Sequence, residues 1–266
     1  MTDEHFRELL DFFDLSWRGY RKVRKGVKKR IIRHMGECGV KSMREYLNLL
    51  RENPKIREQC KILLTVSISR FFRDKMLWQV LEKKILPDIM KNESSVNVWS
   101  AGCACGEEVY TFKIIWEQLN KKSNIYSQLY LLATDINPEY IEKAKAGCYG
   151  LSSLKEVTNE IKNKYFEQCK SSLLYKVKDH LKTDIVWKVR DILDTPPERE
   201  FHLIFLRNNL LTYYGDKIKE KALENILRVL KPGGYIIKGA HEKIPVSDTR
   251  LVKTEFHPHI YQKTTP

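Results

Sequence analysis

Apolar positions recur at helical spacing through the first 90 residues. In each of five segments apolar side chains return every three to four positions, as in amphipathic helices that pack together. Asn53 and Pro54 interrupt this pattern, as expected where one helix ends and the next begins. The pattern predicts an all-helical N-terminal domain over residues 1–90. Its expected helices are Phe6–Phe13, Tyr20–Met35, Met43–Leu50, Ile56–Leu64 and Leu77–Met90.

A different pattern follows the polar, turn-rich segment Lys91–Ser95. Short apolar runs, typical of strands buried on both faces, alternate with helical stretches. This alternation predicts a parallel sheet with helices on both sides, the doubly wound, Rossmann-like α/β fold, over residues 91–266. Besides a first strand that begins at Val96, the strongest strand signals are Leu129–Ala133, Phe201–Leu206 and Gly234–Lys238.

Two segments depart from this alternation. Between Tyr175 and Val189 polar and apolar residues alternate singly, which predicts a small antiparallel β subdomain near residues 170–190, inserted into the α/β domain. Near the C-terminus, Leu251–Phe256 and His259–Gln262 are predicted to form a hairpin that closes the sheet.

The turn after the first predicted strand indicates a ligand site. Gly102 and Gly106 are followed by a helix and by a second strand that ends in Asp135. Two glycines do not make the three-glycine dinucleotide fingerprint, but a carboxylate at the tip of the second strand can accept hydrogen bonds from both ribose hydroxyls. Asp135 also has a simpler interpretation, as part of a helix start in which Asn137 is the cap and Pro138 the first helical residue. Both can hold together.

The helix that begins after this turn narrows the choice of cofactor. Glu107 and Glu108 lie in its first turn, where acidic residues suit the helix dipole. Two carboxylates there would repel a diphosphate, which normally binds the amide groups of a helix start. A cofactor with no phosphate and a positively charged group fits better, and S-adenosylmethionine (SAM) is such a molecule.

Composition adds limits on location and on metal binding. The chain has 266 residues, enough for one large domain or two modest ones. No apolar run approaches the roughly eighteen residues of a membrane span, and no charged-then-apolar leader follows Met1. We therefore expect a soluble, cytoplasmic protein, and a monomer. Six cysteines without paired C-x-x-C spacing predict neither a metal site nor a disulfide framework.

Positive charge is concentrated in one segment. The net charge is +14, and Arg18–Arg33 contains nine Lys or Arg residues and no acid. Tyr20, Val23, Val27 and Ile31 recur there at helical spacing, so the helix buries one stripe and exposes the basic residues. The exposed side is either a solvated face or a surface for an acidic partner. Nucleic acid is not expected, because the segment has few aromatic residues to stack on bases.

Six short segments, taken in order, carry a family resemblance. They are Ser69–Asp74, Trp99–Tyr110, Ala133–Asn137, Ala144–Tyr149, Phe205–Asn208 and Leu230–Gly234. With these segments the chain resembles, over nearly its whole length, the chemotaxis receptor methyltransferases, which are SAM-dependent protein-glutamate O-methyltransferases. The resemblance implies a helical N-terminal domain joined to a SAM-binding α/β domain with a small β subdomain.

The resemblance also implies site residues and a partner. The residues expected to contact SAM, or its product S-adenosylhomocysteine, are Ser67, Ser69, Arg73, Gly102, Glu107, Glu108, Asp135, Ile136, Asp191, Ile192, Arg207 and Asn208. In the family the helical domain faces an acidic bundle of receptor helices, the cytoplasmic domain of a chemoreceptor. The basic segment Arg18–Arg33 would be the surface that contacts such a substrate.

The implied reaction suits these residue types. Methyl transfer from a sulfonium is an in-line displacement, so the enzyme mainly has to align the reacting groups. A glutamate side chain, with an unperturbed pKa of about 4.3, is already ionised and needs no general base. Arg73 is expected to hold the substrate carboxylate in a fixed fork, unless it only forms a local ion pair with Asp74.

One departure from the family keeps other functions open. Thr212 occupies the position at which the family has a tyrosine, and Tyr213 follows it. Either the loop shifts by one residue and Tyr213 takes the catalytic role, or the active site differs. The chain could then methylate another protein or a small acid, or could retain SAM only as a non-catalytic docking module.

Overall fold

Five helices at the N-terminus pack around a core of their own. The computed structural model describes the chain except residues 123–126, 171–172, 246–249 and 265–266. Phe6, Leu9, Ile31, Tyr46 and Leu50 are completely buried between these helices. The helices are α1 (Asp3–Phe12), α2 (Trp17–Tyr20), α3 (Arg24–Glu37), α4 (Met43–Glu52) and α5 (Pro54–Leu63).

Local sequence explains most of these helix ends. Ser42 forms a capping box with Glu45 at the start of α4, and the Asn53 side chain caps α5, whose first residue is Pro54. The helix expected over Tyr20–Met35 is broken between α2 and α3. The short α2 packs against a later part of the chain so closely that a Cβ atom on Gly19 would clash with the Thr212 carbonyl oxygen.

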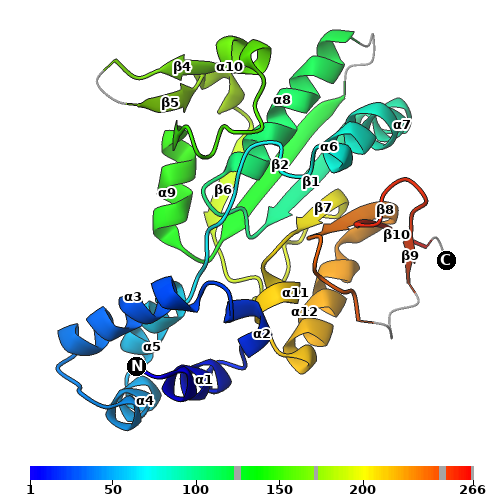
Figure 1. Ribbon diagram of the computed structural model, residues 1–266. Helices are drawn as coiled ribbons and strands as arrows, with labels where there is room; N and C mark the ends of the chain where they lie inside the picture. Colours follow the sequence, from blue (N-terminus) through cyan, green and yellow to red (C-terminus); the bar gives the residue numbers. More distant parts are fainter. Residues whose placement is uncertain (123–126, 171–172, 246–249, 265–266) are drawn as a thin grey trace.

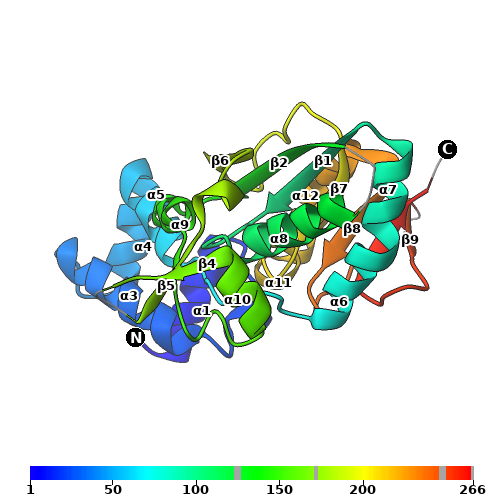
Figure 2. The same ribbon diagram turned by 90° about the horizontal axis from the view of Figure 1, so that it is seen from above.

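The helical stretch before the sheet belongs to the sheet. It comprises α6 (Lys75–Val80), a π-helical turn (Leu81–Ile85) and α7 (Leu86–Asn92). Figures 1 and 2 show α6 and α7 beside the strands, apart from α1–α5. Leu77 and Ile85 are buried in the main core, and the Trp78 ring stacks on Phe205 at a centroid distance of 5.4 Å. The packing thus differs from the predicted division at residue 90, since the N-terminal core ends near Leu64.

The main sheet contains seven strands in the order β6-β2-β1-β7-β8-β10-β9. Strands β6, β2, β1, β7 and β8 are parallel, and β10 pairs antiparallel with both β8 and β9, which confirms the predicted terminal hairpin. The strands are β1 (Ser95–Ala101), β2 (Gln128–Asp135), β6 (Ile185–Val189), β7 (Phe201–Leu206), β8 (Leu230–Lys238), β9 (Leu251–Lys253) and β10 (Ile260–Lys263).

Helices cover both faces of this sheet. On one face α8 (Glu107–Lys122) packs with α6 and α7 over residues such as Val98 and Leu131. On the other, α11 (Leu210–Tyr213) and α12 (Asp216–Arg228) pack over residues such as Trp99 and Leu132. The remaining crossover helix is α9 (Pro138–Ala146). The doubly wound, Rossmann-like prediction is confirmed. Of the helices that the structure describes, none has both the length and the apolar character needed to cross a lipid bilayer.

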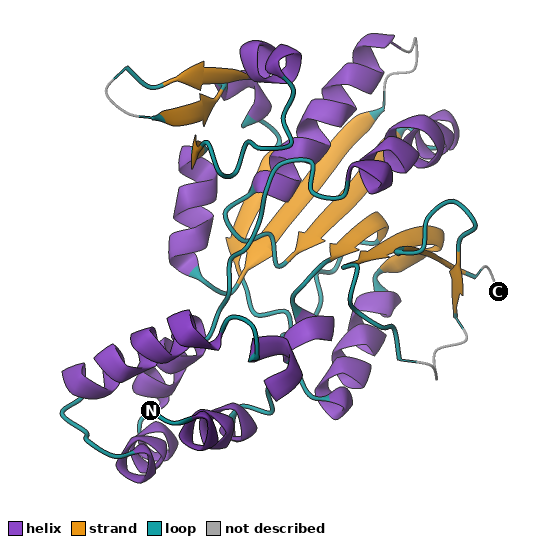
Figure 3. Ribbon diagram, viewed as in Figure 1, coloured by secondary structure: helices purple, strands orange, loops and turns teal. Residues whose placement is uncertain are grey.

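A separate three-stranded antiparallel sheet, in the order β3-β5-β4, lies beside α8 and beyond the end of α9 (Figures 1 and 3). Its elements are β3 (Cys148–Gly150), α10 (Asn159–Tyr165), β4 (Phe166–Gln168) and β5 (Leu174–Val177). The predicted subdomain exists but is placed earlier than residues 170–190, of which 171–172 lie outside the described residues.

The prediction was wrong about the second half of that segment. Strand β6 does not pair with β5; it pairs in parallel with β2 at the edge of the main sheet. Ile185 and Trp187 pack on the core of one sheet face and Val186 on that of the other, while Lys188 and Val189 at the end of the strand are exposed. A period of two marks a strand, but it does not identify the strand with which it pairs.

Candidate active site

A cavity of about 410 Å³ lies at the carboxyl ends of the parallel strands. The loops after β1, β2, β6 and β7 line it, contributing for example Gly102, Asp135, Asp191 and Arg207. Strands β2 and β7 flank β1 on opposite sides, so the cavity lies at the point where the strand order reverses. Ligands of doubly wound sheets bind at this position, and the volume is within the usual range for small-molecule pockets.

The glycine turn is locked to the end of the next strand. The backbone N–H groups of Gly102 and Cys103 both donate to the Thr134 carbonyl at 2.8 Å. Gly102 has φ of +86°, a conformation that glycine adopts without steric cost. The Asn209 side chain donates to the Ala101 carbonyl and lies so close that a Cβ atom on Gly102 would clash with it. Asn209 therefore positions the turn, although sequence reasoning missed it.

Asp135 takes part in the predicted helix start and lines the cavity. One carboxylate oxygen accepts from the Asn137 N–H and the other from the Ala104 N–H, each at 2.9 Å. Asn137 in turn caps α9 by accepting from the Glu139 N–H. Burial raises the pKa of Asp135, and the amide hydrogen bonds oppose that shift. The carboxylate is thus fixed at the cavity wall with lone pairs left for a ligand.

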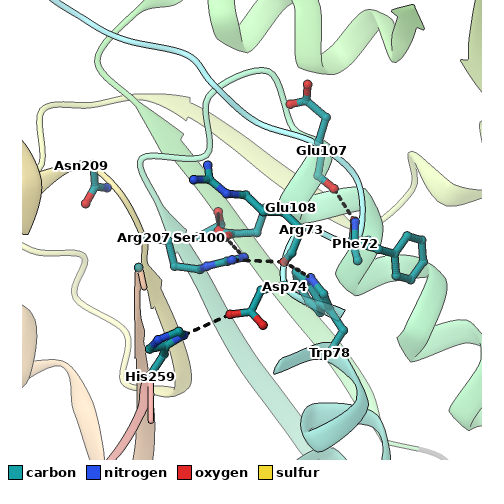
Figure 4. A network of polar contacts seen from close by, with 12 residues as sticks. Phe72, Arg73, Asp74, Trp78, Ser100, Glu107, Glu108, Arg207, Asn209 and His259 are labelled. Atoms are coloured by element: carbon teal, nitrogen blue, oxygen red, sulfur yellow. Dashed lines mark hydrogen bonds and ion pairs between the residues drawn. The ribbon is translucent and has the colours of Figure 1, made fainter. Parts of the chain in front are cut away.

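Glu108 and Arg207 form a buried pair beneath the cavity. Glu108 accepts from the Ser100 hydroxyl at 2.9 Å and from the Arg207 guanidinium at 3.2 Å (Figure 4). Burial raises the pKa of Glu108, and Arg207 opposes this shift. A second guanidinium nitrogen of Arg207 donates to the Arg73 carbonyl at 3.2 Å. Arg207 thus links the side chain of Glu108 to the backbone of Arg73, two residues predicted to contact the cofactor.

Glu107 points away from this pair (Figure 4). One oxygen accepts from the Ser153 hydroxyl at 3.2 Å, while the other is buried and has no hydrogen-bond partner among the described residues. Glu107 does not line the cavity, and neither does Ser67, whose hydroxyl lies 3.5 Å from the Cys105 sulfur. The other predicted cofactor residues, from Ser69 to Asn208, all line it.

The environment of Glu107 predicts a pH effect on stability. Burial raises the pKa of the Glu107 carboxyl above its ordinary value of 4.5. The contribution of this group to the free energy of unfolding is therefore complete below pH 4.5 and is lost as the pH rises through the folded-state pKa. Glu107→Gln removes this loss. We expect the variant to gain on the order of 1 kcal/mol in unfolding free energy relative to the parent protein between pH 5 and pH 8. Urea unfolding at both pH values measures this gain. Glu220→Gln, at an exposed position, is the control. A difference in unfolding free energy between Glu107→Gln and the parent protein that does not change with pH would contradict the prediction.

Arg73 presents its guanidinium to the cavity. One nitrogen donates to the Ile68 carbonyl at 2.8 Å, and no carboxylate lies within ion-pair distance among the described residues. Burial lowers the pKa of Arg73, and the neighbouring Arg207 adds to this effect. The alternative of a local pair with Asp74 is not observed, because Asp74 contacts two histidines instead.

Thr212 and Tyr213 both line the cavity but have different contacts. The Thr212 hydroxyl donates to Glu242 at 2.6 Å. The Tyr213 ring packs against Tyr20 of α2 at a centroid distance of 4.9 Å, and burial raises its pKa to about 12. Tyr213 therefore stays protonated near neutral pH. Because the Thr212 hydroxyl is already engaged, the geometry favours Tyr213 as the residue that faces a ligand.

The N-terminal helices close the opposite wall of the cavity. Lys61 of α5 forms an ion pair with Asp191, and the Asn137 side chain donates to the Thr65 hydroxyl at 3.1 Å. Lys61 and Thr65 also line the cavity. Sequence reasoning missed both Lys61 and Thr65, because neither belongs to a recognisable motif and Lys61 lies 130 positions before its partner Asp191.

Comparison with known proteins agrees with this geometry. Residues 67–260 match the family described as CheR methyltransferase, SAM binding domain. The chain belongs to this family. It is a SAM-dependent methyltransferase, and the match covers the loops that line the cavity.

Individual relatives are more distant. The chain is 28% identical to a chemotaxis protein methyltransferase of Vibrio parahaemolyticus over 79% of this chain and 77% of that protein. It is 27% identical to an uncharacterized 104.1 kDa protein of Rhodobacter capsulatus, over 90% of this chain but only 25% of that protein. The N-methyltransferase NodS of Bradyrhizobium japonicum aligns with a TM-score of 0.40 and 14% identity, over 73% of this chain and 100% of NodS.

Proposed function

We propose that this CheR-family methyltransferase transfers the methyl group of SAM to glutamate side chains of an acidic, helical protein of the chemoreceptor type. The products are a neutral methyl ester and S-adenosylhomocysteine. The observation that carries the proposal is Arg73, a partly buried guanidinium that faces the cofactor cavity without an acidic partner among the described residues. A substrate carboxylate would supply that partner. The relatives named as chemotaxis methyltransferases support the same substrate class.

The cavity fits SAM by its chemistry. Asp135, held by two backbone amides, is the ribose acceptor in our assignment. The buried acid Glu108 lies at the helix start where a phosphate group would otherwise bind, which suits a cofactor without phosphate. The remaining predicted contacts that line the cavity are Ser69, Gly102, Ile136, Asp191, Ile192, Arg207 and Asn208. Glu107 and Ser67 would act only through the residues that they support.

When bound, SAM supplies the electrophilic methyl group. The protein's task is then alignment, because the carboxylate is already ionised. The Arg73 guanidinium offers parallel N–H donors that hold a carboxylate in one plane. The protonated Tyr213 lines the cavity and can donate a hydrogen bond. Its ring would offer an aromatic face to a bound sulfonium, an attraction of roughly 0.5–2 kcal/mol. Removal of the substrate carboxylate from water strengthens each of these contacts.

We assign partner binding to a basic surface on α2 and α3. Of the nine basic residues in Arg18–Arg33, three have internal roles: Arg24 and Lys28 pair with Asp3, and Arg30 donates to backbone carbonyls. The other six are exposed, and they define the basic surface: Arg18, Arg21, Lys22, Lys25, Lys29 and Arg33. An acidic bundle of helices would complement it.

Charge reversal tests this surface. Lys22→Glu, Lys25→Glu and Lys29→Glu combined should raise KM for the protein substrate by about tenfold or more at low salt and by less at 0.5 M salt, because exposed charges are screened. Methyl transfer to a purified receptor domain is the assay. Reversal of Lys217 and Lys221, exposed on α12, serves as the matched control. If charge reversal changes KM no more at low salt than at 0.5 M salt, the basic surface does not bind the substrate through its charge and is merely solvated.

Transfer of label from methyl-labelled SAM into host extract tests the reaction itself. Mild alkali releases volatile methanol from a methyl ester, so base-labile label on a protein would support the proposal. Base-stable label would move the substrate to nitrogen, sulfur or another oxygen, and label confined to small molecules would indicate a free acid. SAM binding without transfer would favour a docking module.

The proposal includes a cytoplasmic location and a monomeric enzyme. All six cysteines are free, as is usual in a reducing compartment. The exposed Cys148 in particular would be open to oxidation elsewhere.

A further inference from the structure

Asp74, His257 and His259 form a polar cluster next to Arg73 and outside the cavity. The Asp74 carboxylate lies 3.0 Å from Nδ1 of His259 and 3.6 Å from Nε2 of His257. One donor atom from each residue lies within 4.8 Å of the other two. None of the three residues lines the cavity, so the cluster is separate from the methyl-transfer site (Figure 4).

The backbone at Asp74 is strained in a way that serves this cluster. Asp74 precedes α6 at the N-cap position, where an aspartate normally accepts a hydrogen bond from the helix. Here its side chain makes no capping bond, and its φ of +69° is left-handed, at a cost of roughly 1–2 kcal/mol. The carboxylate is instead directed at the two imidazoles. Strain retained at one position is a sign of a local requirement.

We propose that Asp74, His257 and His259 bind a divalent transition-metal ion of the Zn²⁺ class. Two imidazole nitrogens and one carboxylate oxygen are ligands that zinc accepts, with a fourth position left for water. Ligand atoms at 2.0–2.1 Å from tetrahedral zinc lie about 3.3 Å from one another. The two Asp74 oxygens lie 3.0 Å from Nδ1 of His259 and 3.6 Å from Nε2 of His257, on either side of this value. A small rotation of the Asp74 side chain would place one oxygen near both nitrogens, and the ligand atoms of the three residues already lie within 4.8 Å of one another.

The surroundings fit the ligand form of the histidines. His257 is 8% exposed, and burial lowers its pKa against the opposing effect of Asp74, which favours the neutral ring that binds metals. The His259 N–H donates to Nδ1 of His257 at a long 3.3 Å. Ligation through Nε2 places the ring proton on Nδ1, so this one contact has to open. Arg207 and Lys238 are the cations that act on the site, and Asp74 is the acid that offsets them.

A metal here would fasten two distant segments beside the active site. His257 and His259 lie in the turn between β9 and β10, and Asp74 directly follows Arg73. The Arg73 carbonyl already accepts from Arg207 and from the Trp78 ring nitrogen, at 3.2 and 2.9 Å. The ion would add a third restraint on this backbone, through Asp74, and so hold the loop that presents the Arg73 side chain.

The test measures metal binding directly and requires no methyl transfer. Untagged full-length protein, stripped with a chelator, is dialysed against Zn²⁺ and analysed for bound metal; Co²⁺ is then substituted to record the visible spectrum. We expect one ion per chain and a four-coordinate Co²⁺ spectrum without a thiolate charge-transfer band. His257→Gln, His259→Gln and Asp74→Asn should each weaken binding by more than about tenfold, since even supporting residues of metal sites have effects of that size.

Matched controls separate this site from others. His5→Gln and Cys148→Ser, both at exposed positions, should leave the affinity unchanged. Circular dichroism checks that each variant is folded. If one variant does not fold, the Co²⁺ spectrum of the unaltered protein still tests the proposal. The proposal would be overturned if the unaltered protein did not retain Zn²⁺, or if folded His257→Gln bound Zn²⁺ as tightly as the unaltered protein. A thiolate band that disappears in Cys148→Ser would also overturn it, because the metal would then be bound by that cysteine. None of these results depends on the identity of the methyl acceptor.

Discussion

Arg73→Ala should lower kcat for methyl transfer by about 10²–10³-fold while the affinity for SAM stays within several-fold. The guanidinium faces the cavity and has no carboxylate partner among the described residues. The main effect of the substitution is therefore that the substrate carboxylate loses the fork of N–H donors that holds it. Removal of one donor that acts in the transition state has effects of this size in other enzymes, about 3–4 kcal/mol. Single-turnover transfer of labelled methyl groups gives the rate, and calorimetry gives the SAM affinity.

Two further variants make this result specific. Arg73→Lys keeps the charge but not the planar fork, so it should recover only part of the rate. Arg228→Ala removes an exposed arginine of α12 that pairs with Glu224 at 3.3 Å, and it should leave the rate unchanged. A loss confined to SAM affinity in Arg73→Ala would assign Arg73 to the cofactor alone, and unaltered transfer would remove it from the active site.

Asp135→Ala should weaken SAM binding by about 100-fold. Each hydrogen bond that a ribose hydroxyl donates to this charged acceptor is worth about 1.5–3 kcal/mol. Two bonds at the lower end of this range account for the expected loss, since a factor of ten corresponds to about 1.4 kcal/mol. The change also leaves the Ala104 and Asn137 N–H groups without their acceptor, so we expect unfolding free energy to fall by about 1–3 kcal/mol. Calorimetry with SAM and urea unfolding measure the two effects.

The control for the Asp135 variant is a nearby carboxylate on α9. Glu139→Ala removes an exposed carboxylate from the first turn of α9 and keeps the backbone N–H that Asn137 accepts from. Its SAM affinity should match that of the parent protein. Equal affinities in Asp135→Ala and the parent would leave Asp135 with only its structural role at the helix start.

The fold was largely predictable because buried strands and amphipathic helices have different periods. The runs Phe201–Leu206 and Gly234–Lys238 are mainly apolar, with His202 and Lys238 as polar exceptions, and such runs are typical of strands buried on both faces. The segment Ile185–Val189 was misplaced because strand periodicity does not reveal the partner, and this strand pairs in parallel with β2 instead of antiparallel with β5. The predicted division at residue 90 rested on helical periodicity and on the polar segment Lys91–Ser95, and neither reveals whether α6 and α7 pack on helices or on strands.

Predicted site residues line the cavity where they belong to one continuous segment of chain. Gly102 directly follows β1 and Asp135 ends β2, and parallel strands end at one edge of the sheet. Glu107 and Glu108 were indistinguishable by sequence, yet neighbouring helix positions point about 100° apart, and only Glu108 faces the cavity. Lys61, Thr65 and Asn209 were missed because their roles depend on segments far away in the chain.

The sequence by itself determined the class of fold, the kind of cofactor and a family in which Arg73 and Asp135 have expected roles, since short motifs and local periodicity are properties of consecutive residues. Only the tertiary structure decided that α2 packs against the Tyr213 loop, that Lys61 pairs with Asp191 across the cavity, and that Asp74 turns from Arg73 toward His259, 185 positions later. Such contacts depend on how helices and strands pack, and packing brings together groups whose separation along the chain carries no signal.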